Sequence, residues 1–320
     1  MNDKDYKVLV KEYEKLNCSR PDIYILSFEE QVARLEKCFA NEKFASQSNE
    51  KKIAVALKWI GDGDSLMKYY VAFNNRDMNY LNDVLFETAH LFQMGNIISP
   101  NCDYGFYGLR ITPNLLAANM MDRIRFLLPQ EAGISKGYFG ACIANLLLAI
   151  MYDNSEIKRD AMNIAMKELQ KKNPDYCKLH VECMIAVLNR DYDTFNVKIN
   201  EYCKSYKKAR EFGFNAFNKR FCIEAHGLYN LARYAFDGAM KDKIKMPVAE
   251  NFCQELALWQ DEHDNVVGKA YHIYPESLDF YNRLMIAEPV QMHLCKSGKK
   301  SCIDTNRFLE EIIIKNNLYI

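Results

Sequence analysis

The sequence predicts an all-α protein, built as an irregular, repeat-like stack of antiparallel helix pairs in the manner of a tetratricopeptide-like α-solenoid or bundle. Two observations lead to this prediction. Apolar residues recur every three to four positions along most of the chain, whereas the strict alternation typical of strands is hard to find. Glycine and proline are scarce, at 13 and 8 of 320 residues, which disfavours sandwiches and barrels because those folds need many turns.

Start signals locate helices in the N-terminal part. Ser27 and Glu30 have the spacing of a capping box, in which each side chain accepts a hydrogen bond from the other residue's backbone. The apolar stripe behind this box consists of Phe28, Val32, Leu35 and Phe39. We expect about four helices in this part.

A further start signal opens the middle of the chain. Thr112 followed by Pro113 is typical of an N-cap and a first-turn proline, and Pro129 should stop the helix. The stripe of this helix runs through Leu116, Met120, Ile124 and Leu127. The pattern therefore predicts one continuous helix from Thr112 to just before Pro129.

Stacked helix pairs are predicted from residue 137 onward. A helix at about 137–152 turns at Asp153-Asn154 into one at about 155–170. A second pair covers about 174–189 and 192–212, and a third opens near Asn218. Short connections make neighbouring helices antiparallel, and each pair must bury its apolar stripe on the next. The helix starts are too irregular for a strict tetratricopeptide array.

We expect one domain over residues 1–320, with an N-terminal helical part at about 1–100 and a repeat-like helical part at about 112–320. The uncharged stretch from Gly137 to Tyr152 is shorter than a membrane-spanning helix and carries a central Asn145, so it predicts a buried core helix. Two regions look irregular. They are residues 97–111 and the histidine-containing residues 261–275.

The first irregular region supplies the candidate partner-binding residues. It contains three aromatic residues and an arginine, a set typical of protein interfaces, namely Tyr104, Phe106, Tyr107 and Arg110. The alternative is that these aromatic side chains fold back as a lid over the core. If the loop is an interface, truncating Tyr107 and Arg110 should weaken partner binding without lowering stability.

Sequence patterns for catalysis, metal binding or cofactor binding are weak. Cys177, His180 and Cys183 follow one another at three-residue steps on one predicted helix, which suits packed thiols beside a hydrogen-bonded histidine better than a zinc site. His226 borders an apolar stripe, so we expect a half-buried histidine bonded to backbone or carboxylate. Ser297 lies in a charged stretch that resembles a surface loop. We predict no catalytic, metal or cofactor site, and therefore no enzyme.

Charge and composition argue against nucleic-acid and membrane partners. Lysine plus arginine equals aspartate plus glutamate, at 42 each, so no global field favours a polyanion. The basic run from Lys204 to Arg220 is interleaved with phenylalanines, but a solvated helix face explains it. The charged N-terminus lacks a signal-peptide pattern. Eleven cysteines without framework spacing predict reduced thiols and a cytoplasmic location.

Three segments carry a resemblance to a known family. They are residues 191–199, which start with Asp191-Tyr192-Asp193-Thr194-Phe195, the alanine- and leucine-rich residues 221–232, and the proline-led residues 274–284. Together they resemble the family-49 immunity proteins of bacterial polymorphic toxin systems, over roughly Gly137 to Ala287. The resemblance implies a helical, non-enzymatic protein that binds a cognate toxin domain and blocks its active site.

Two other functions remain open. The first is a tetratricopeptide-like scaffold or peptide-binding regulator, and a toxin gene immediately upstream would favour the immunity protein over it. The second is an enzyme that uses Cys177, His180 and Cys183 or an unrecognised carboxylate site, which stoichiometric zinc in the purified protein would support. The oligomeric state does not follow from the sequence.

Overall fold

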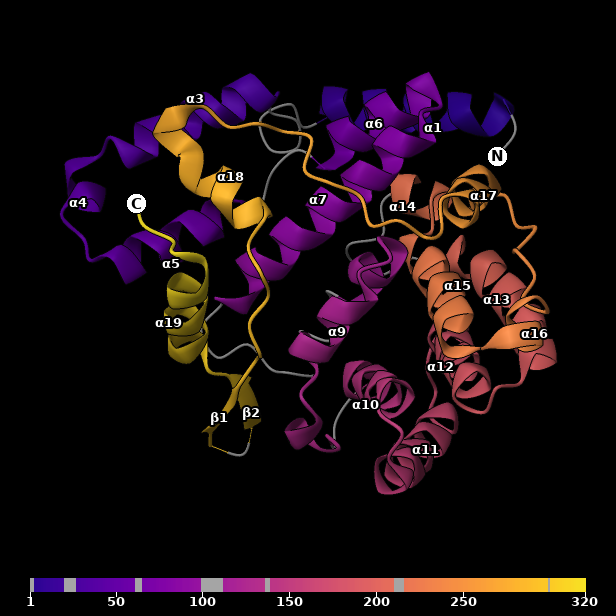
Figure 1. Cartoon of the computed structure of the whole chain (residues 1–320). Helices are drawn as coiled ribbons and strands as arrows, with labels where there is room; N and C mark the ends of the chain where they lie inside the picture. Colours follow the sequence, from indigo (N-terminus) through magenta and orange to yellow (C-terminus); the bar gives the residue numbers. More distant parts are fainter. Residues whose placement is uncertain are drawn as a thin grey trace. The chain divides into compact units, whose positions relative to one another are not determined.

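The computed structural model describes residues 3–19, 27–60, 65–98, 112–135, 139–209, 216–298 and 300–320. Within these ranges nearly all regular structure is helical, and the strands form a single two-stranded hairpin (Figure 1). The predicted all-α class is confirmed. None of the helices in these ranges is both long enough and apolar enough to cross a membrane.

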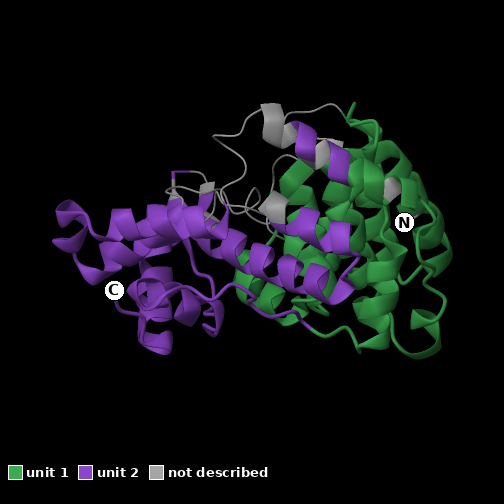
Figure 2. Cartoon of the chain, turned by 90° about the horizontal axis from the view of Figure 1, so that it is seen from above, with its two compact units in different colours: residues 1–9, 104–266 green, residues 10–103, 267–320 purple. Residues whose placement is uncertain are grey.

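The chain groups into two compact units, which Figure 2 colours separately. Unit 1 contains residues 1–9 and 104–266, and unit 2 contains residues 10–103 and 267–320. The first boundary falls inside helix α1 (Asp3–Ser19). The expectation of a single domain remains a prediction, because compactness alone does not measure whether a unit folds independently.

Unit 1 is a succession of helices. Its described elements are a helix at residues 112–117, α9 (Met121–Leu127), the 3₁₀ turn η1 (Gln130–Ala132), α10 (Phe139–Met151), α11 (Ser155–Leu169), α12 (Asp175–Leu188), α13 (Tyr192–Tyr206), α14 (Ala216–Arg220), α15 (Ile223–Ala235), α16 (Gly238–Lys241) and α17 (Gln254–Glu262).

The predicted helix pairs form the centre of unit 1. α10 packs on α11 and α12 packs on α13, while α12 also contacts both α10 and α15. Tyr176 near the start of α12 makes an edge-to-face contact with Tyr206 at the end of α13, as antiparallel neighbours must. The third predicted pair is incomplete, because α15 is followed only by the four-residue α16.

Side-chain caps set the starts of the second helix in each pair. The Asn154 Oδ1 accepts hydrogen bonds from the backbone of Glu156 and Ile157 at the start of α11. The Asp191 Oδ1 accepts one from Thr194 N at the start of α13. Each cap satisfies a backbone donor that has no partner within its helix. The predicted turn at Asp153-Asn154 is thereby confirmed.

The helix predicted from Thr112 to Pro129 is interrupted. It forms residues 112–117 and then α9, with a turn between them in which Asn119 has a φ of 56°. This left-handed conformation cannot continue a right-handed helix, and asparagine tolerates it better than most residues do. The prediction of one continuous helix is therefore wrong, whereas the stop before Pro129 is confirmed because α9 ends at Leu127.

α10 is the buried core helix predicted from its uncharged sequence. Its residues from Gly140 to Ala149 are all buried. Asn145, the polar residue in the middle, donates from Nδ2 to Ser135 O at 2.8 Å and accepts from Ser135 N at 2.9 Å. This paired bonding lets an amide lie in the core without an unsatisfied polar group.

Unit 2 combines the N-terminal helices with the C-terminal residues. Its described elements are α3 (Phe28–Phe39), α4 (Glu42–Ala45), α5 (Asn49–Ile60), α6 (Ser65–Asn75), α7 (Met78–Ile97), the 3₁₀ turn η2 (Glu276–Leu278), α18 (Asp279–Met285), the strands β1 (Leu294–Ser297) and β2 (Lys300–Ile303), and α19 (Thr305–Asn316). The predicted capping box is present, since Ser27 N donates to the Glu30 carboxylate and Glu30 N donates to the Ser27 hydroxyl.

The hairpin β1–β2 differs from the surface loop expected around Ser297. Leu294 to Ser297 pair antiparallel with Lys300 to Ile303. Gly298, at the turn, has a φ of 60°. A positive φ at this position is what two-residue hairpin turns require, and glycine supplies it without steric cost.

Candidate functional site

The residues predicted to bind a partner lie outside the described part of the chain. Tyr104, Phe106, Tyr107 and Arg110 all fall in the interval between residues 98 and 112. Their role remains a prediction from the sequence. The candidate site described below is therefore built from other residues of unit 1.

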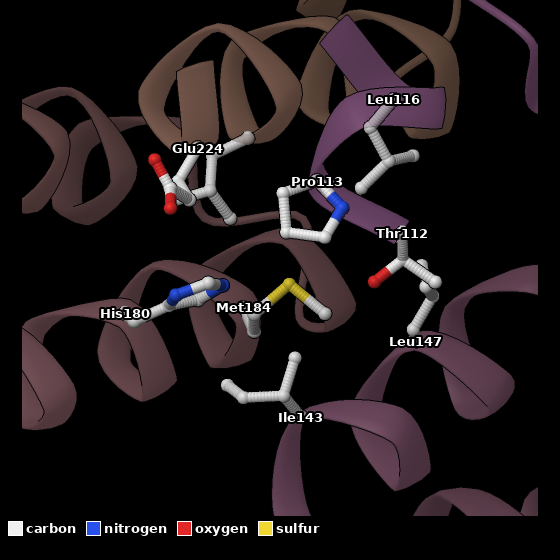
Figure 3. A pocket seen from close by; sticks show the side chains of 9 residues that line it. Thr112, Pro113, Leu116, Ile143, Leu147, His180, Met184 and Glu224 are labelled. Carbon is white, nitrogen blue, oxygen red and sulfur yellow. The ribbon is translucent and has the colours of Figure 1, made fainter. Parts of the chain in front are cut away.

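Three helices of unit 1 face one small hollow. Each helix contributes two side chains that are four positions apart in the sequence and therefore lie on the same face of that helix. The six residues are Ile143 and Leu147 of α10, His180 and Met184 of α12, and Glu224 and Leu228 of α15. We call this the inner face of the helix stack. Figure 3 shows Pro113, Met184 and Ile143 converging on the hollow, with the His180 ring at its edge.

The helix at residues 112–117 covers the inner face. Thr112, Pro113 and Leu116 complete the lining of the hollow. The Asn230 Nδ2 donates to the carbonyl oxygens of Leu116 and Ala117 at 3.1 and 3.2 Å. The side chain of Gln260 donates to Ala117 O at 3.1 Å. A face that could hold a helix from another protein is therefore occupied by this chain's own helix.

The close fit of this helix depends on Gly227 of α15. A Cβ atom at this position would lie 2.9 Å from Pro113 O and 3.1 Å from the Leu116 Cβ. Both distances are tighter than ordinary contacts between such atoms. Glycine therefore allows α15 and residues 112–117 to approach each other.

The hollow itself has room for about one water molecule, at about 10 Å³. Such a space can hold a bridging water, but it does not admit a substrate or a coenzyme.

His180 is the buried titratable group beside the hollow. The Phe139 and Tyr202 rings both make T-shaped contacts with its imidazole. Desolvation lowers its pKa to about 4, because burial disfavours the charged imidazolium. The ring is therefore neutral near pH 7.

Glu224 contributes a carboxyl group with the opposite shift. Burial raises its pKa above the ordinary value of 4.5, although a hydrogen bond from the Tyr206 hydroxyl opposes that shift. The pKa shifts of His180 and Glu224 are thus both in the direction of the uncharged form. Paired pKa shifts of this kind are frequent at functional sites. Here the two groups line a hollow with room for about one water molecule, so we interpret their role as structural.

The metal site weighed from the sequence does not assemble. Cys177, His180 and Cys183 are all buried on α12, and burial raises the pKa of the Cys183 thiol well above 9.0, which disfavours the thiolate that binds metal. Among the residues that the structure describes, no three histidine, cysteine, aspartate or glutamate side chains gather around a common point.

His226 has the structural role predicted from its position. Its Nε2 accepts a hydrogen bond from Cys253 N at 3.1 Å, and its ring stacks on Phe252. The expected bond to backbone is confirmed, although the side chain is fully rather than half buried. Desolvation lowers its pKa to about 3, so this imidazole is neutral near pH 7 and its Nε2 serves as a hydrogen-bond acceptor.

Unit 2 contains a buried ionic cluster around Glu87 of α7. Its Oε1 accepts hydrogen bonds from the Lys68 ammonium and the His272 Nδ1, both at 2.8 Å. Its Oε2 accepts from Tyr271 N and His272 N at 3.1 and 3.2 Å. Burial alone would raise the pKa of Glu87, but the hydrogen bonds from the His272 and Lys68 side chains and the charge of Lys68 lower it to about 2.

The cluster holds an extended segment, residues 268–274, along α7. We call this segment the strap. Asp83, one turn before Glu87, accepts a hydrogen bond from Lys269 N at 2.9 Å. Gly268 lies so close to α7 that a Cβ atom there would be 2.5 Å from Asn82 O. Phe28 stacks on the His272 ring, with centroids 3.9 Å apart.

A second extended segment is held in the same way in unit 1. The Asn196 side chain donates to Lys243 O and accepts from Lys245 N. Asn200, one turn later on α13, accepts from Val248 N at 2.9 Å. In both units, polar side chains four positions apart on a helix bind the backbone of an extended segment.

Ion pairs neutralise part of the basic run from Lys204 to Arg220, which was predicted to be a solvated helix face. Glu250 pairs with Lys207 at 2.6 Å and with Arg220 at 3.8 Å. These ion pairs leave less of the run available to a polyanion, which supports the interpretation as a helix face.

Sequence reasoning did not single out Lys68, Asp83 or Glu87. Asp83 and Glu87 lie about 185 positions from the strap residues that they bind, and Lys68 lies 19 positions from Glu87. A spacing of four between carboxylates was visible, but it is common on exposed helices and does not reveal a distant backbone partner. The irregular region predicted at residues 261–275 is confirmed from residue 263 onward, whereas Asp261 and Glu262 belong to the end of α17.

Comparison with known proteins adds no relative. No protein-family model, no curated protein and no solved structure matches this chain.

Proposed function

We propose that this protein acts by binding another protein without catalysing a reaction, as an immunity protein that neutralises a cognate toxin domain does. The observation that carries this proposal is the inner face, where three helices enclose a helix of the same chain around a hollow for one water. The side chains of the inner face are used to pack the protein's own helix. The outer surface of the helix stack is therefore the part that remains to bind a partner.

The titratable groups support the same function. His226 accepts a backbone hydrogen bond, and three of the four donors around Glu87 belong to the protein's own strap. These groups are used for architecture rather than for binding a small molecule. A protein partner instead needs about 800 Å² of surface on each side, which a stack of helices can offer.

Co-expression tests the proposal. The gene adjacent to this one should encode a protein that stops bacterial growth when it is expressed alone. Co-expression of the present protein should restore growth, and the two proteins should co-purify. Failure of both readouts would contradict the proposal.

A matched set of variants tests the predicted contact residues. Tyr107→Ala and Arg110→Ala should weaken co-purification without lowering the melting temperature. Tyr319→Ala and Arg307→Ala are the controls, because both residues are exposed and belong to unit 2 rather than to the helix stack of unit 1, and they should leave co-purification unchanged. Equal losses of melting temperature with unchanged affinity would locate the interface elsewhere.

A second candidate is a helical scaffold that binds extended peptides. The bonds from Asn196 and Asn200 to an extended backbone favour it, because the same chemistry would suit a peptide from another protein. Binding to unfolded peptides in an array, without growth rescue, would select this function over the first.

A further inference from the structure

The hairpin β1–β2 brings two cysteines directly opposite each other. Cys295 pairs with Cys302 in the antiparallel register. Asp304 N donates to His293 O at 2.9 Å, and hydrogen-bonded pairs recur at every second position along such a ladder. Cys295 and Cys302 are therefore also a hydrogen-bonded pair.

The spacing of this pair suits a disulfide. The Cα atoms of a hydrogen-bonded antiparallel pair lie about 5.5 Å apart. Disulfides bridge Cα atoms at about 4.4–6.8 Å. Both side chains leave the same face of the hairpin, because directly opposite residues point to the same side.

The two thiols differ in their access to solvent. Cys295 is the one exposed thiol among the nine cysteines whose side chains the structure describes, and Cys302 is buried. Both are free. An outside reagent would therefore meet Cys295 first, with Cys302 within reach to react next.

We propose that Cys295 and Cys302 form a redox modification site, which closes as a reversible cross-strand disulfide by exchange with a low-molecular-weight disulfide such as oxidised glutathione. This inference is independent of the proposed function, because it rests on the hairpin alone.

The exchange takes two displacements. The Cys295 thiolate attacks one sulfur of the small disulfide, forming a mixed disulfide and releasing one small thiolate. The Cys302 thiolate then attacks the Cys295 Sγ, forming the cross-strand bond and releasing the second small thiolate. Two protein thiols are oxidised, the small disulfide is reduced, and the two protons from the protein pass to the released thiolates.

The closed form should stabilise the hairpin. A two-stranded hairpin is marginally stable by itself, and a covalent link between its strands reduces the conformations open to its unfolded form. The exposed position of Cys295 should keep the bond reducible, as exposed disulfides are the labile ones.

Mass spectrometry of the folded, full-length protein tests this inference. The wild type is incubated with oxidised glutathione, and its remaining free thiols are then alkylated in acid. Apart from the added alkyl groups, its mass should be lower by two hydrogens. Peptide mapping should link Cys295 to Cys302, and dithiothreitol should reverse the change. A glutathione adduct that persists on Cys295, a link to another cysteine, or no reaction of either thiol would overturn the proposal.

Serine variants test the order of the steps. Cys302→Ser should stop at the mixed disulfide on Cys295, because the second thiol is missing. Cys295→Ser should leave Cys302 unmodified, because that thiol is shielded. Cys38→Ser is the control for a half-buried cysteine on α3 and should form the Cys295–Cys302 link as the wild type does. Formation of the linked product's mass in either hairpin variant would contradict the assignment.

Discussion

Glu87 illustrates how single residues hold this fold together. Its carboxylate is fully buried, yet it accepts hydrogen bonds from Lys68, from His272 and from two backbone N–H groups. A buried charge is costly unless donors of this kind surround it. The cluster therefore stabilises the strap only as long as the carboxylate is ionised.

Replacing Glu87 with glutamine should strongly destabilise the protein. Glu87→Gln keeps the size of the side chain but leaves the buried Lys68 ammonium without its counter-charge, which costs about 3–5 kcal/mol. Urea unfolding at pH 7 measures the difference. Asp279→Asn is the control, because its exposed pair with Arg283 should contribute less than about 1 kcal/mol. Equal stabilities of Glu87→Gln and the wild type would show that the cluster is not needed.

The shifted pKa values predict that stability falls with falling pH in two steps. The pKa values of His180 and His226 lie at about 4 and 3, below the ordinary 6.5. The unfolded chain therefore binds more protons than the folded one, and stability is lost as the pH falls from about 6.5. Glu87, lowered from 4.5 to about 2, adds a loss below about pH 4.5.

Urea unfolding at a series of pH values separates the two steps. The slope of the free energy of unfolding against pH reports the difference in bound protons between the unfolded and folded states. His180→Leu should reduce this slope between pH 6.5 and 4 by the equivalent of up to one proton. Glu87→Gln should change it only below about pH 4.5. A pH profile that neither substitution alters would contradict these assignments.

Single residues were predictable where their partners are local. The Ser27–Glu30 capping box and the backbone-bonded His226 follow from neighbouring residues and are confirmed. Glu87 was not predicted, since its donors come from α6 and from the strap. Glu87 was missed because its strap donors are far away in the sequence, and not because its interactions are weak.

At the scale of elements, the contact between α15 and residues 112–117 controls the inner face. Gly→Ala in a helix ordinarily stabilises by about 0.5–1 kcal/mol. At Gly227 the new Cβ would lie 2.9 Å from Pro113 O, so we expect Gly227→Ala to destabilise unit 1 by about 1–3 kcal/mol, as overpacking does. Thermal unfolding measures this change.

An exposed helix position provides the comparison for Gly227. Asn163 lies on the exposed side of α11, so Asn163→Ala should raise stability by a few tenths of a kcal/mol through helix propensity alone. If Gly227→Ala behaves in the same way, the close approach of the two helices is not a constraint.

Elements were predicted best where periodicity and caps agree. α10 to α12 lie within two residues of their predicted bounds, whereas α13 starts where it was predicted but ends at Tyr206, before the predicted end at about residue 212. The break at Asn119 was missed because the apolar stripe continues across it. The hairpin was missed because its strands have four residues each, too few for an alternating pattern to emerge among charged neighbours.

At the scale of the whole molecule, the all-α class followed from composition and periodicity, whereas the grouping of distant segments did not. Residues 267–320 belong to the same compact unit as residues 10–103. Hydrophobic spacing identifies the buried side of a helix but not the segment that covers it. For the same reason, the occupation of the inner face by residues 112–117 could not be predicted.

The most direct test of the central claim, binding without turnover, is a titration of this protein into an activity assay of its growth-inhibiting partner. A binding protein must inhibit one partner molecule for each of its own, so activity should fall linearly and reach its minimum at an equimolar ratio. Complete loss of partner activity at a small fraction of that ratio would mean that each molecule acts repeatedly, and would contradict the claim.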